Sequence, residues 1–349
     1  MKINNSNKNY FWNSHTLNDF QQLLICNNVH SYLITSICFL KDGSIASSSD
    51  DKYILIYNKN TFKIDIRIKE NKGIHYMNVT KDGILIACMN GTYLNLYEIK
   101  DKKYKNIQTI RPYNLFIDFI GIFDDTYSIQ KFIELKNGNL AICVWQYGIC
   151  FYEKKKNSKK YSYVNQFRTK INNSATDLVE LDDNQYCVSF RFEQLIKFLD
   201  MNLKNITHVI NTNKIFSSDS KNQIFLMNKN DLLLAGKSNI LIIDVQKKII
   251  INNIQFKIIG HLSFMYRLSE KMILLGGWGN YIEQIEYDEV KKTIKSISNN
   301  GKKDFNILDI NSKLYQISTI SEFNNNLIVS SYKNQLGNSS LIIYQFKNN

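Results

Sequence analysis

Pairs of adjacent aspartates are the first residues in this sequence that could carry chemistry. They occur at Asp50-Asp51, Asp124-Asp125 and Asp182-Asp183. Two neighbouring carboxylates could act as general acid and base or hold a metal ion. The first and third pairs fall in segments typical of tight hairpin turns, where aspartate is favoured because its side chain bonds the nearby backbone. We therefore interpret the acid pairs as turn residues.

The histidines, cysteines and glycines do not supply a reactive centre either. The five histidines have no metal-binding or triad spacing, and the six cysteines include no CxxC pair and are interpreted as core thiols. Gly276-Gly277-Trp278-Gly279 is rich in glycine but lacks the Lys-Ser or Lys-Thr of a phosphate-binding loop. We expect no cofactor, no metal, no small-molecule substrate and no enzymatic activity.

A unit that recurs seven times is the strongest pattern in the chain. Each copy has an apolar strand, a polar turn rich in Lys, Asp, Asn and Gly, a second apolar run and then small residues. The second runs are Ile45–Ser48, Ile84–Cys88, Leu140–Cys143, Tyr186–Ser189, Leu232–Gly236, Met272–Gly277 and Leu327–Ser331. Their spacing of about 40 to 55 residues is typical of four-stranded propeller blades. Asp-Gly and Asn-Gly in the turns supply the positive φ of tight hairpins.

Third and fourth strands complete the predicted unit. Third strands follow at Tyr53–Asn58, Leu195–Asp200 and equivalent positions, and a weaker fourth follows, as at Phe62–Ile68. The prediction is an all-β, seven-bladed β-propeller of four-stranded antiparallel blades. Because the last copy has only three strands, we expect Phe20–Cys26 to pair beside Leu341–Phe346 and close the ring. Two β-sandwiches are the alternative, but they need a central linker rich in Pro, Ser or Gly.

The segment from His30 to Asn58 is the most complete copy and carries a resemblance. It contains His30, then Ser48 and Asp50, then Tyr57, and it resembles one WD40 repeat. In that family a His, a Ser, an Asp and a Trp form a buried hydrogen-bonded set, and the resemblance implies that role for these four residues. No copy ends in the Trp-Asp pair of the family name, so another propeller family stays an alternative. The resemblance covers residues 16–346.

Residues 1–15 are rich in Asn and Lys and are expected to form a flexible segment, followed by a single propeller domain over 16–349. The first residues lack the apolar region of a secretory signal, and no apolar run reaches the roughly 18 residues of a membrane span. We therefore expect a cytoplasmic protein.

The predicted topology divides the loops between two faces of the disc. Turns between second and third strands, together with the connections between blades, lie on what we call the aromatic face. It carries Trp145, Gln146, Tyr147, Arg191, Phe192, Lys237, Trp278 and Tyr332. Large aromatics and arginine are enriched at interface hot spots, because they bury much area at little entropic cost. An aromatic residue at a strand end could instead pack on the neighbouring blade.

Loops between third and fourth strands lie on the opposite face, which we call the lysine face. Lysine runs occur there in four blades, and the densest comprises Lys154, Lys155, Lys156, Lys159 and Lys160. The formal net charge of +13 favours acidic partners. AT-rich codons and the composition of hairpin tips also favour lysine.

These observations predict a non-catalytic protein-protein interaction scaffold with other proteins, including acidic ones, as partners. The alternative is binding of a polyanion, either nucleic acid or an anionic membrane, through the lysine face. Tyr104, Tyr161 and Tyr163 lie beside lysines and would favour nucleic acid through base stacking. The sequence alone leaves the partner and the binding face open.

Overall fold

The computed structural model describes the chain over 20–112, 128–145, 147–168, 174–181, 185–191, 193–200, 205–213, 215–216, 223–236, 239–255, 262–267, 271–277, 282–296, 315–323, 326–333 and 338–346. These residues form strands, turns and connections, and no helix occurs among them. The same residues accordingly contain no helix with the length and apolar character needed to cross a bilayer.

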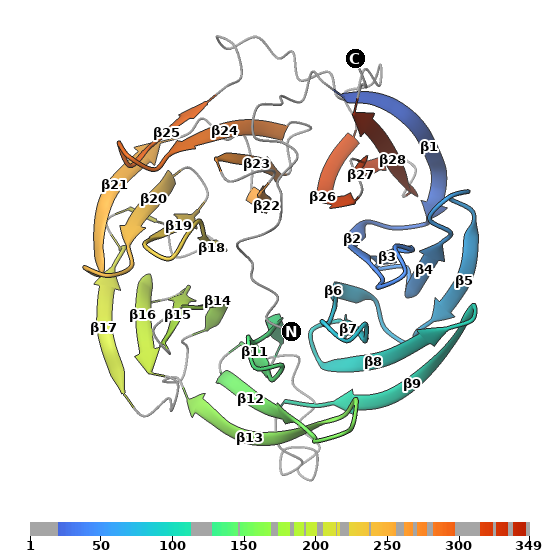
Figure 1. Ribbon diagram of the computed structural model, residues 1–349, viewed down its shortest axis with the longest axis horizontal. Helices are drawn as coiled ribbons and strands as arrows, with labels where there is room; N and C mark the ends of the chain where they lie inside the picture. Colours follow the sequence, from blue (N-terminus) through green and yellow to red (C-terminus); the bar gives the residue numbers. More distant parts are fainter. Residues whose placement is uncertain are drawn as a thin grey trace.

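Seven sheets, each of four antiparallel strands, stand around a ring (Figure 1). Blade 1 contains β2 (Ile34–Phe39), β3 (Ile45–Ser49), β4 (Tyr53–Tyr57) and β5 (Ile64–Lys69). Blade 2 contains β6 (Ile74–Val79), β7 (Leu85–Met89), β8 (Tyr93–Lys100) and β9 (Lys103–Ile110). Blade 3 contains β10 (Ile129–Glu134), β11 (Leu140–Val144), β12 (Gly148–Lys154) and β13 (Tyr161–Arg168). In these blades the strands run in chain order from the inner to the outer edge (Figure 1).

The next three blades repeat this order. Blade 4 contains β14 (Ala175–Glu180), β15 (Gln185–Phe190), β16 (Leu195–Asp200) and β17 (Ile206–Asn211). Blade 5 contains β18 (Gln223–Leu226), β19 (Asp231–Ala235), β20 (Asn239–Asp244) and β21 (Ile249–Gln255). Blade 6 contains β22 (Leu262–Arg267), β23 (Met272–Gly277), β24 (Ile282–Asp288) and β25 (Thr293–Ser296). The all-β prediction with seven four-stranded blades is confirmed, and the two-sandwich alternative is wrong.

Blade 7 is assembled from both ends of the described chain. Its inner strands are β26 (Tyr315–Phe323), β27 (Asn326–Lys333) and β28 (Asn338–Phe346), and its outer strand is β1 (Phe20–His30). In the antiparallel register Phe20 lies opposite Phe346 and Cys26 opposite Leu341. The predicted pairing of Phe20–Cys26 with the last strand is therefore present.

The hairpins between first and second strands have the backbone geometry that their glycines predict. Gly43, Gly83 and Gly138 have φ of +87°, +86° and +87°. In each turn the glycine N–H donates to the carbonyl three residues earlier, at 2.9, 2.8 and 2.9 Å. Glycine is favoured at these positions because a Cβ is poorly tolerated at positive φ.

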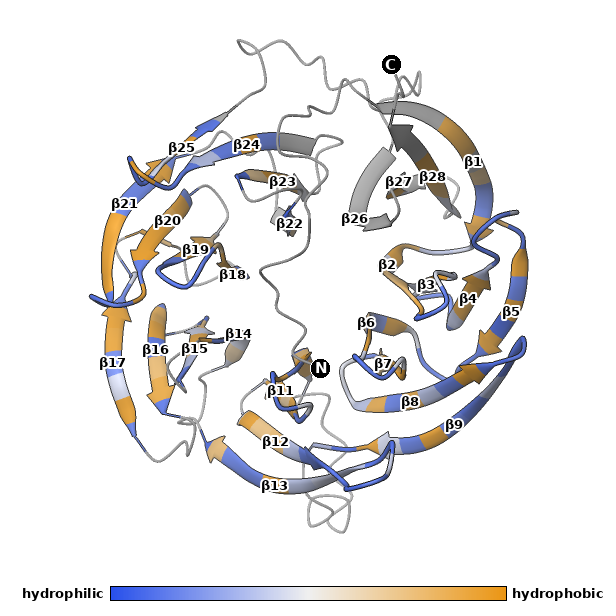
Figure 2. Cartoon of the chain, viewed as in Figure 1, coloured by the Kyte–Doolittle hydropathy of each residue, from blue (hydrophilic) through white to orange (hydrophobic). Residues whose placement is uncertain are grey.

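The hydrophobic core lies between the blades. Six clusters among the described residues each join two neighbouring blades, for example Cys38, Ile54 and Ile66 of blade 1 with Met77 and Leu85 of blade 2. Second and third strands are apolar on both sides because a blade lies against each side, so the central residues of β20, Ile-Leu-Ile-Ile, are all hydrophobic (Figure 2). Side chains alternate along each strand between the two neighbouring blades.

Candidate interaction surfaces

A chain of buried polar side chains links β1, β3 and β4 near the aromatic face. The imidazole of His30 lies 2.9 Å from Asp51 through Nδ1 and 2.7 Å from the Ser47 hydroxyl through Nε2. The Ser47 hydroxyl in turn lies 3.1 Å from the Tyr57 hydroxyl. Because a carboxylate only accepts, Nδ1–H donates to Asp51, and Nε2 of a neutral ring accepts from Ser47. His30 is 1% exposed.

For two of the four members of this set, the prediction is wrong by one position in the sequence. The prediction used Ser48 and Asp50, whereas Ser47 and Asp51 make the contacts. Ile45 lies directly opposite Tyr57 in the sheet, so both side chains point to the same side. Ser47, two residues after Ile45, points to that side as well. Ser48 points to the other side, where its hydroxyl lies 3.1 Å from the Thr35 hydroxyl.

Asp51 is the charged member of the set, and Asp50 lies outside it. The Asp51 carboxylate also accepts from the backbone N–H groups of Ser31 and Tyr53, each at 3.0 Å. Burial opposes ionisation of Asp51, but the hydrogen bonds from His30 and these amides bring its pKa below the ordinary value. The Asp50 side chain is 43% exposed and lies 4.0 Å from His75. The first acid pair is thus a turn pair with one structural member.

On the aromatic face, blades 3 and 4 meet through a stacked pair. The Arg191 guanidinium lies over the Trp145 ring, with Cζ 5.4 Å from the ring centroid. Trp145 follows β11 and Arg191 follows β15, so both occupy turns between second and third strands. The Trp145 N–H donates to the Ser128 carbonyl at 2.7 Å, and the Arg191 N–H donates to the Ser174 carbonyl at 3.1 Å. Each bond holds the turn against the start of the inner strand of its own blade. Both side chains are partly exposed.

A second Arg–aromatic pair lies within blade 3. Arg168 Cζ is 5.9 Å from the centroid of the Tyr147 ring, and Arg168 is exposed at the end of β13. Gly148, next to Tyr147, pairs with Arg168 across the sheet, so the two side chains come from the same end of the blade. Sequence reasoning missed Arg168, although the topology rule that assigns the connections between blades to this face could have found it.

Only part of the predicted aromatic face falls within the described residues. Gln146, Phe192, Lys237 and Trp278 lie outside the described residues, as does the side chain of Tyr332. Tyr32, between β1 and β2, is 58% exposed at this end of blade 1 and was not predicted. The described part of the predicted surface is therefore Trp145, Tyr147 and Arg191, with Arg168 added.

Lysines at the opposite end of the blades tie neighbouring blades together. The Lys81 amine of blade 2 donates to the carbonyls of Leu135 and Lys136 in blade 3, at 3.2 and 3.1 Å. The Lys136 amine of blade 3 repeats this contact with Leu181 of blade 4, at 3.3 Å. Part of the lysine content therefore serves the contacts between blades.

The five predicted lysines of the β12–β13 loop fall into two groups. Lys154 forms an ion pair with Asp82, and Lys159 forms one with Glu98 at 2.6 Å. Lys155, Lys156 and Lys160 are exposed. The carbonyl of Lys160 accepts from the Lys155 N–H at 2.9 Å, and the Asn139 side chain accepts from the Lys154 N–H at 3.0 Å. These hydrogen bonds and ion pairs hold the loop in a defined conformation.

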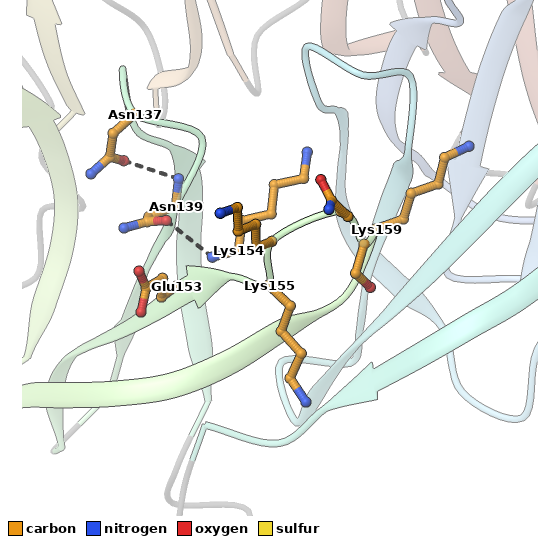
Figure 3. A pocket seen from close by; sticks show the side chains of 9 residues that line it. Asn137, Asn139, Glu153, Lys154, Lys155 and Lys159 are labelled. Carbon is orange, nitrogen blue, oxygen red and sulfur yellow. Dashed lines mark hydrogen bonds between the residues drawn. The ribbon is translucent and has the colours of Figure 1, made fainter.

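An open hollow of about 660 Å³ adjoins this loop and is lined by residues 153–159 with Asn137 and Asn139 (Figure 3). The side chains of Lys155 and Lys159 point in different directions (Figure 3). The hollow therefore lacks the converging donors that would hold one small anion.

Reactive side chains are scarce in the described part of the chain. No group of three His, Cys, Asp or Glu residues there is placed to hold a metal ion. Five cysteines are buried and Cys26 is partly so, and all six are free. Burial raises the pKa of Cys150 to about 12, which makes that thiol a poor nucleophile. The interpretation of the cysteines as core thiols agrees with these positions.

No family model and no curated protein matches this chain. Solved structures match it at the level of fold. Raptor of Chaetomium thermophilum has a TM-score of 0.69 at 12% identity, over 95% of this chain and 29% of Raptor. This chain therefore spans less than a third of Raptor's length.

Two further solved structures match over almost their whole length. A chain of the Mitotic Checkpoint Complex has a TM-score of 0.67 at 8% identity, over 94% of this chain and 92% of that one. The β-propeller domain of Cps50 (Swd1) from Myceliophteria thermophila has a TM-score of 0.63 at 11% identity, over 94% and 100%. The fold is that of a WD40-like β-propeller, as the resemblance in the sequence predicted.

Proposed function

We propose that this chain is a non-catalytic scaffold that binds other proteins through the aromatic face, at the boundary between blades 3 and 4. The observation that carries the proposal is the Arg191–Trp145 stack, with the Arg168–Tyr147 pair beside it. Tryptophan, tyrosine and arginine are the residue types that most often dominate binding energy at protein interfaces.

The stacked arrangement favours binding because the side chains are already ordered. A guanidinium over an aromatic ring loses less conformational entropy on binding than a free side chain. A chain of similar fold in the Mitotic Checkpoint Complex supports protein partners by analogy of fold. We further propose the cytoplasm as the place of action, which imaging of a tagged chain would test.

Quantitative affinity capture from the source cells tests the scaffold proposal. The full-length chain, the double variant Trp145→Ala/Arg191→Ala and a control variant Arg67→Ala/Val290→Ala serve as baits. The control changes an exposed arginine on β5 and a valine that is 92% exposed in the β24–β25 turn, both away from the stack. Each interface truncation should cost on the order of 1 to 4 kcal/mol of binding free energy.

The expected result is a set of proteins captured equally by the wild type and the control, and reduced at least about tenfold with the aromatic variant. Purified partner and chain should then show the same loss by titration calorimetry. Full retention of every captured protein by the stably folded aromatic variant would overturn the proposal.

A further inference from the structure

The outer strand of blade 3 turns a tyrosine and an arginine toward blade 2. Along β13, Tyr163 lies opposite Tyr152, and Arg168 lies opposite Gly148. Gly148 and Tyr152 occupy the same side of β12, because side chains alternate along a strand. Tyr152 belongs to the core cluster that blades 2 and 3 share, and Tyr147, in the turn before β12, packs against that cluster. Tyr147, Tyr163 and Arg168 are therefore on the same side of blade 3.

Contacts bring these three side chains together. The Arg168 guanidinium lies over the Tyr147 ring, with Cζ 5.9 Å from the ring centroid. The Tyr163 ring meets the buried Tyr152 ring edge to face, with centroids 5.7 Å apart. Burial raises the pKa of Tyr163 most, Tyr147 raises it further and Arg168 lowers it, so Tyr163 lies within electrostatic range of both. The three side chains form one surface at the aromatic-face end of blade 3.

This surface is open to solvent and continues to blade 2. Tyr163 is 52% exposed, Arg168 is exposed and Tyr147 is partly exposed. Arg111 follows the outer strand of blade 2 and is exposed as well. Its carbonyl accepts from the Tyr152 hydroxyl at 3.2 Å, which ties the end of that strand to blade 3. We call Tyr147, Tyr163, Arg111 and Arg168 the tyrosine–arginine surface.

No carboxylate offsets the arginines at this end of blade 3 within the part of the chain that the structure describes. The described residues there are Ser128, Trp145, Tyr147, Gly148 and Arg168. On blade 4, Glu193 is already paired with Lys197 at 2.8 Å. A ligand must therefore supply the negative charge that complements the arginines. It must also supply apolar groups, because rings bind mainly through the area they bury.

The shape of the surface favours a narrow ligand. Tyr163 and Arg168 lie on one strand, roughly 15 Å apart at the usual rise per residue. An extended peptide of about five residues spans the same length. Because β13 is the outermost strand of its blade, its exposed side chains toward blade 2 form a single row. A single row suits one extended segment better than a broad folded face.

We infer that the tyrosine–arginine surface binds an extended, acidic segment of a partner protein. The carboxylates of the segment lie near Arg111 and Arg168, and its aromatic or aliphatic side chains cover Tyr147 and Tyr163. The inference rests on the proposed function in that it takes the ligand to be a partner protein, and it names the chemistry of the part that binds. Trp145 and Tyr147 share one turn, so this surface adjoins the Arg191–Trp145 stack.

Fluorescence anisotropy with the full-length chain tests this inference. The probe is a labelled copolymer of glutamate and tyrosine, titrated at about 150 mM salt to screen exposed lysines. The arginine variant is Arg111→Glu/Arg168→Glu, and its control, Lys155→Glu/Lys160→Glu, makes the same change in net charge on exposed lysines of the lysine face.

The tyrosine variant also has a matched control. Tyr163→Ala is compared with Tyr104→Ala, since Tyr104 on β9 is 46% exposed and its ring likewise packs edge to face on a buried tyrosine, Tyr97, with centroids 6.2 Å apart. Tyr104 lies between Lys103 and Lys105 near the lysine-face end of blade 2. It therefore tests exposed tyrosine in general.

Affinity for the copolymer should fall at least about tenfold with the arginine variant and about fivefold with Tyr163→Ala. Both controls should bind like the wild type. If the arginine variant has a lower unfolding temperature, glutamine at both positions replaces glutamate, and the loss should still exceed that of the lysine control. Equal losses in the arginine and lysine variants would overturn the inference. Equal affinity for polyglutamate of the same length would do so as well, because the rings would then contribute nothing.

Affinity capture separates this inference from the proposed function. The arginine variant serves as an additional bait beside Trp145→Ala/Arg191→Ala. Proteins lost from the Trp145→Ala/Arg191→Ala bait but kept in full by the arginine variant would overturn the inference and leave the scaffold proposal standing. Copolymer binding that requires Arg111, Arg168 and Tyr163, with no protein lost from the Trp145→Ala/Arg191→Ala bait, would support the inference and count against the proposed site.

Discussion

The two ends of the blades use polar and charged side chains in different ways. At the aromatic face Asp51 is enclosed by His30 and two backbone amides, and Arg191 lies over Trp145. At the lysine face Lys159 and Glu98 form an ion pair whose side chains are 46% and 38% exposed. Buried polar groups depend on their partners, whereas exposed charges are solvated with or without them.

This difference shows why net charge is a poor guide to a binding surface. Of the five lysines predicted to form a basic patch, two are engaged with acids of blade 2 and three are left for a ligand. On the aromatic face, by contrast, two arginines lie over aromatic rings. The contacts that each lysine or arginine makes matter more for binding than the number of positive charges.

Removal of residues 1–29 is expected to have the largest effect. It deletes β1 up to His30 and leaves β28 with an unpaired edge. We expect aggregation and a lower unfolding temperature, measured by light scattering and calorimetry. A chain lacking only residues 1–19 is the control. A monomeric Δ1–29 chain with unchanged unfolding would show that β1 does not close the ring.

Asp51→Ala should cost about 1 to 3 kcal/mol of unfolding free energy, because it leaves His30 and two backbone amides without their acceptor. Its neighbour provides a matched control. Asp50→Ala removes a side chain that is 43% exposed and should change stability by no more than about 0.5 kcal/mol. Urea unfolding of both variants measures the difference. Equal losses would mean that the buried set does not stabilise this end of the blade.

Alanine substitutions at two turn glycines allow the two ends of blade 2 to be compared by their effects on stability. Gly91 at the aromatic face has φ +70°, and a Cβ there would lie 2.8 Å from the Ser128 Cβ. Gly83 at the lysine face has φ +86°, and its Cβ would lie 3.2 Å from the Lys41 Cβ, a longer and less severe contact. Both alanine variants are strained, by about 1 kcal/mol or more, and Gly91→Ala should be the less stable in urea. The reverse order would show that the contact with Ser128 does not determine the cost of a side chain at position 91.

The pH dependence of the unfolding free energy should show that the Asp51 carboxylate is ionised in the folded protein. Its pKa is lowered in the folded state from an ordinary value of 3.8, so its contribution is complete above that value and is lost as pH falls through the folded pKa. The stability gap between wild type and Asp51→Asn should therefore be constant near neutral pH and shrink below about pH 4. Thermal unfolding at several pH values measures the gap. A gap that persists unchanged at the lowest pH would argue against an ionised Asp51.

The smallest effect is expected at the exposed Lys159–Glu98 ion pair of the lysine face. Lys159→Ala removes a single contact between solvated groups, which contributes little because water screens it. We expect no measurable change in the unfolding temperature, with Lys160→Ala as a control that removes no ion pair. A clear loss for Lys159→Ala alone would show that this pair fastens blade 3 to blade 2.

The sequence by itself determined the number of blades and the position of most strands. Met272–Gly277 and Leu195–Asp200 were predicted at their observed bounds, and β7 is shifted by one residue from Ile84–Cys88. The pairing of β1 with β28 followed from counting strands. These features are predictable because apolar runs and turn glycines act locally, through burial and through φ.

Tertiary structure alone decided which polar residues meet. Ser47 and Asp51, rather than Ser48 and Asp50, contact His30, because a shift of one residue moves a side chain to the other side of a strand. Arg168 and Tyr147 are far apart in sequence and meet because β12 and β13 pair. Which lysines remain available likewise depends on acids in the neighbouring blade, Asp82 and Glu98. Strand pairing within a blade sets the first two roles and contacts between blades set the third, and no local sequence pattern encodes either.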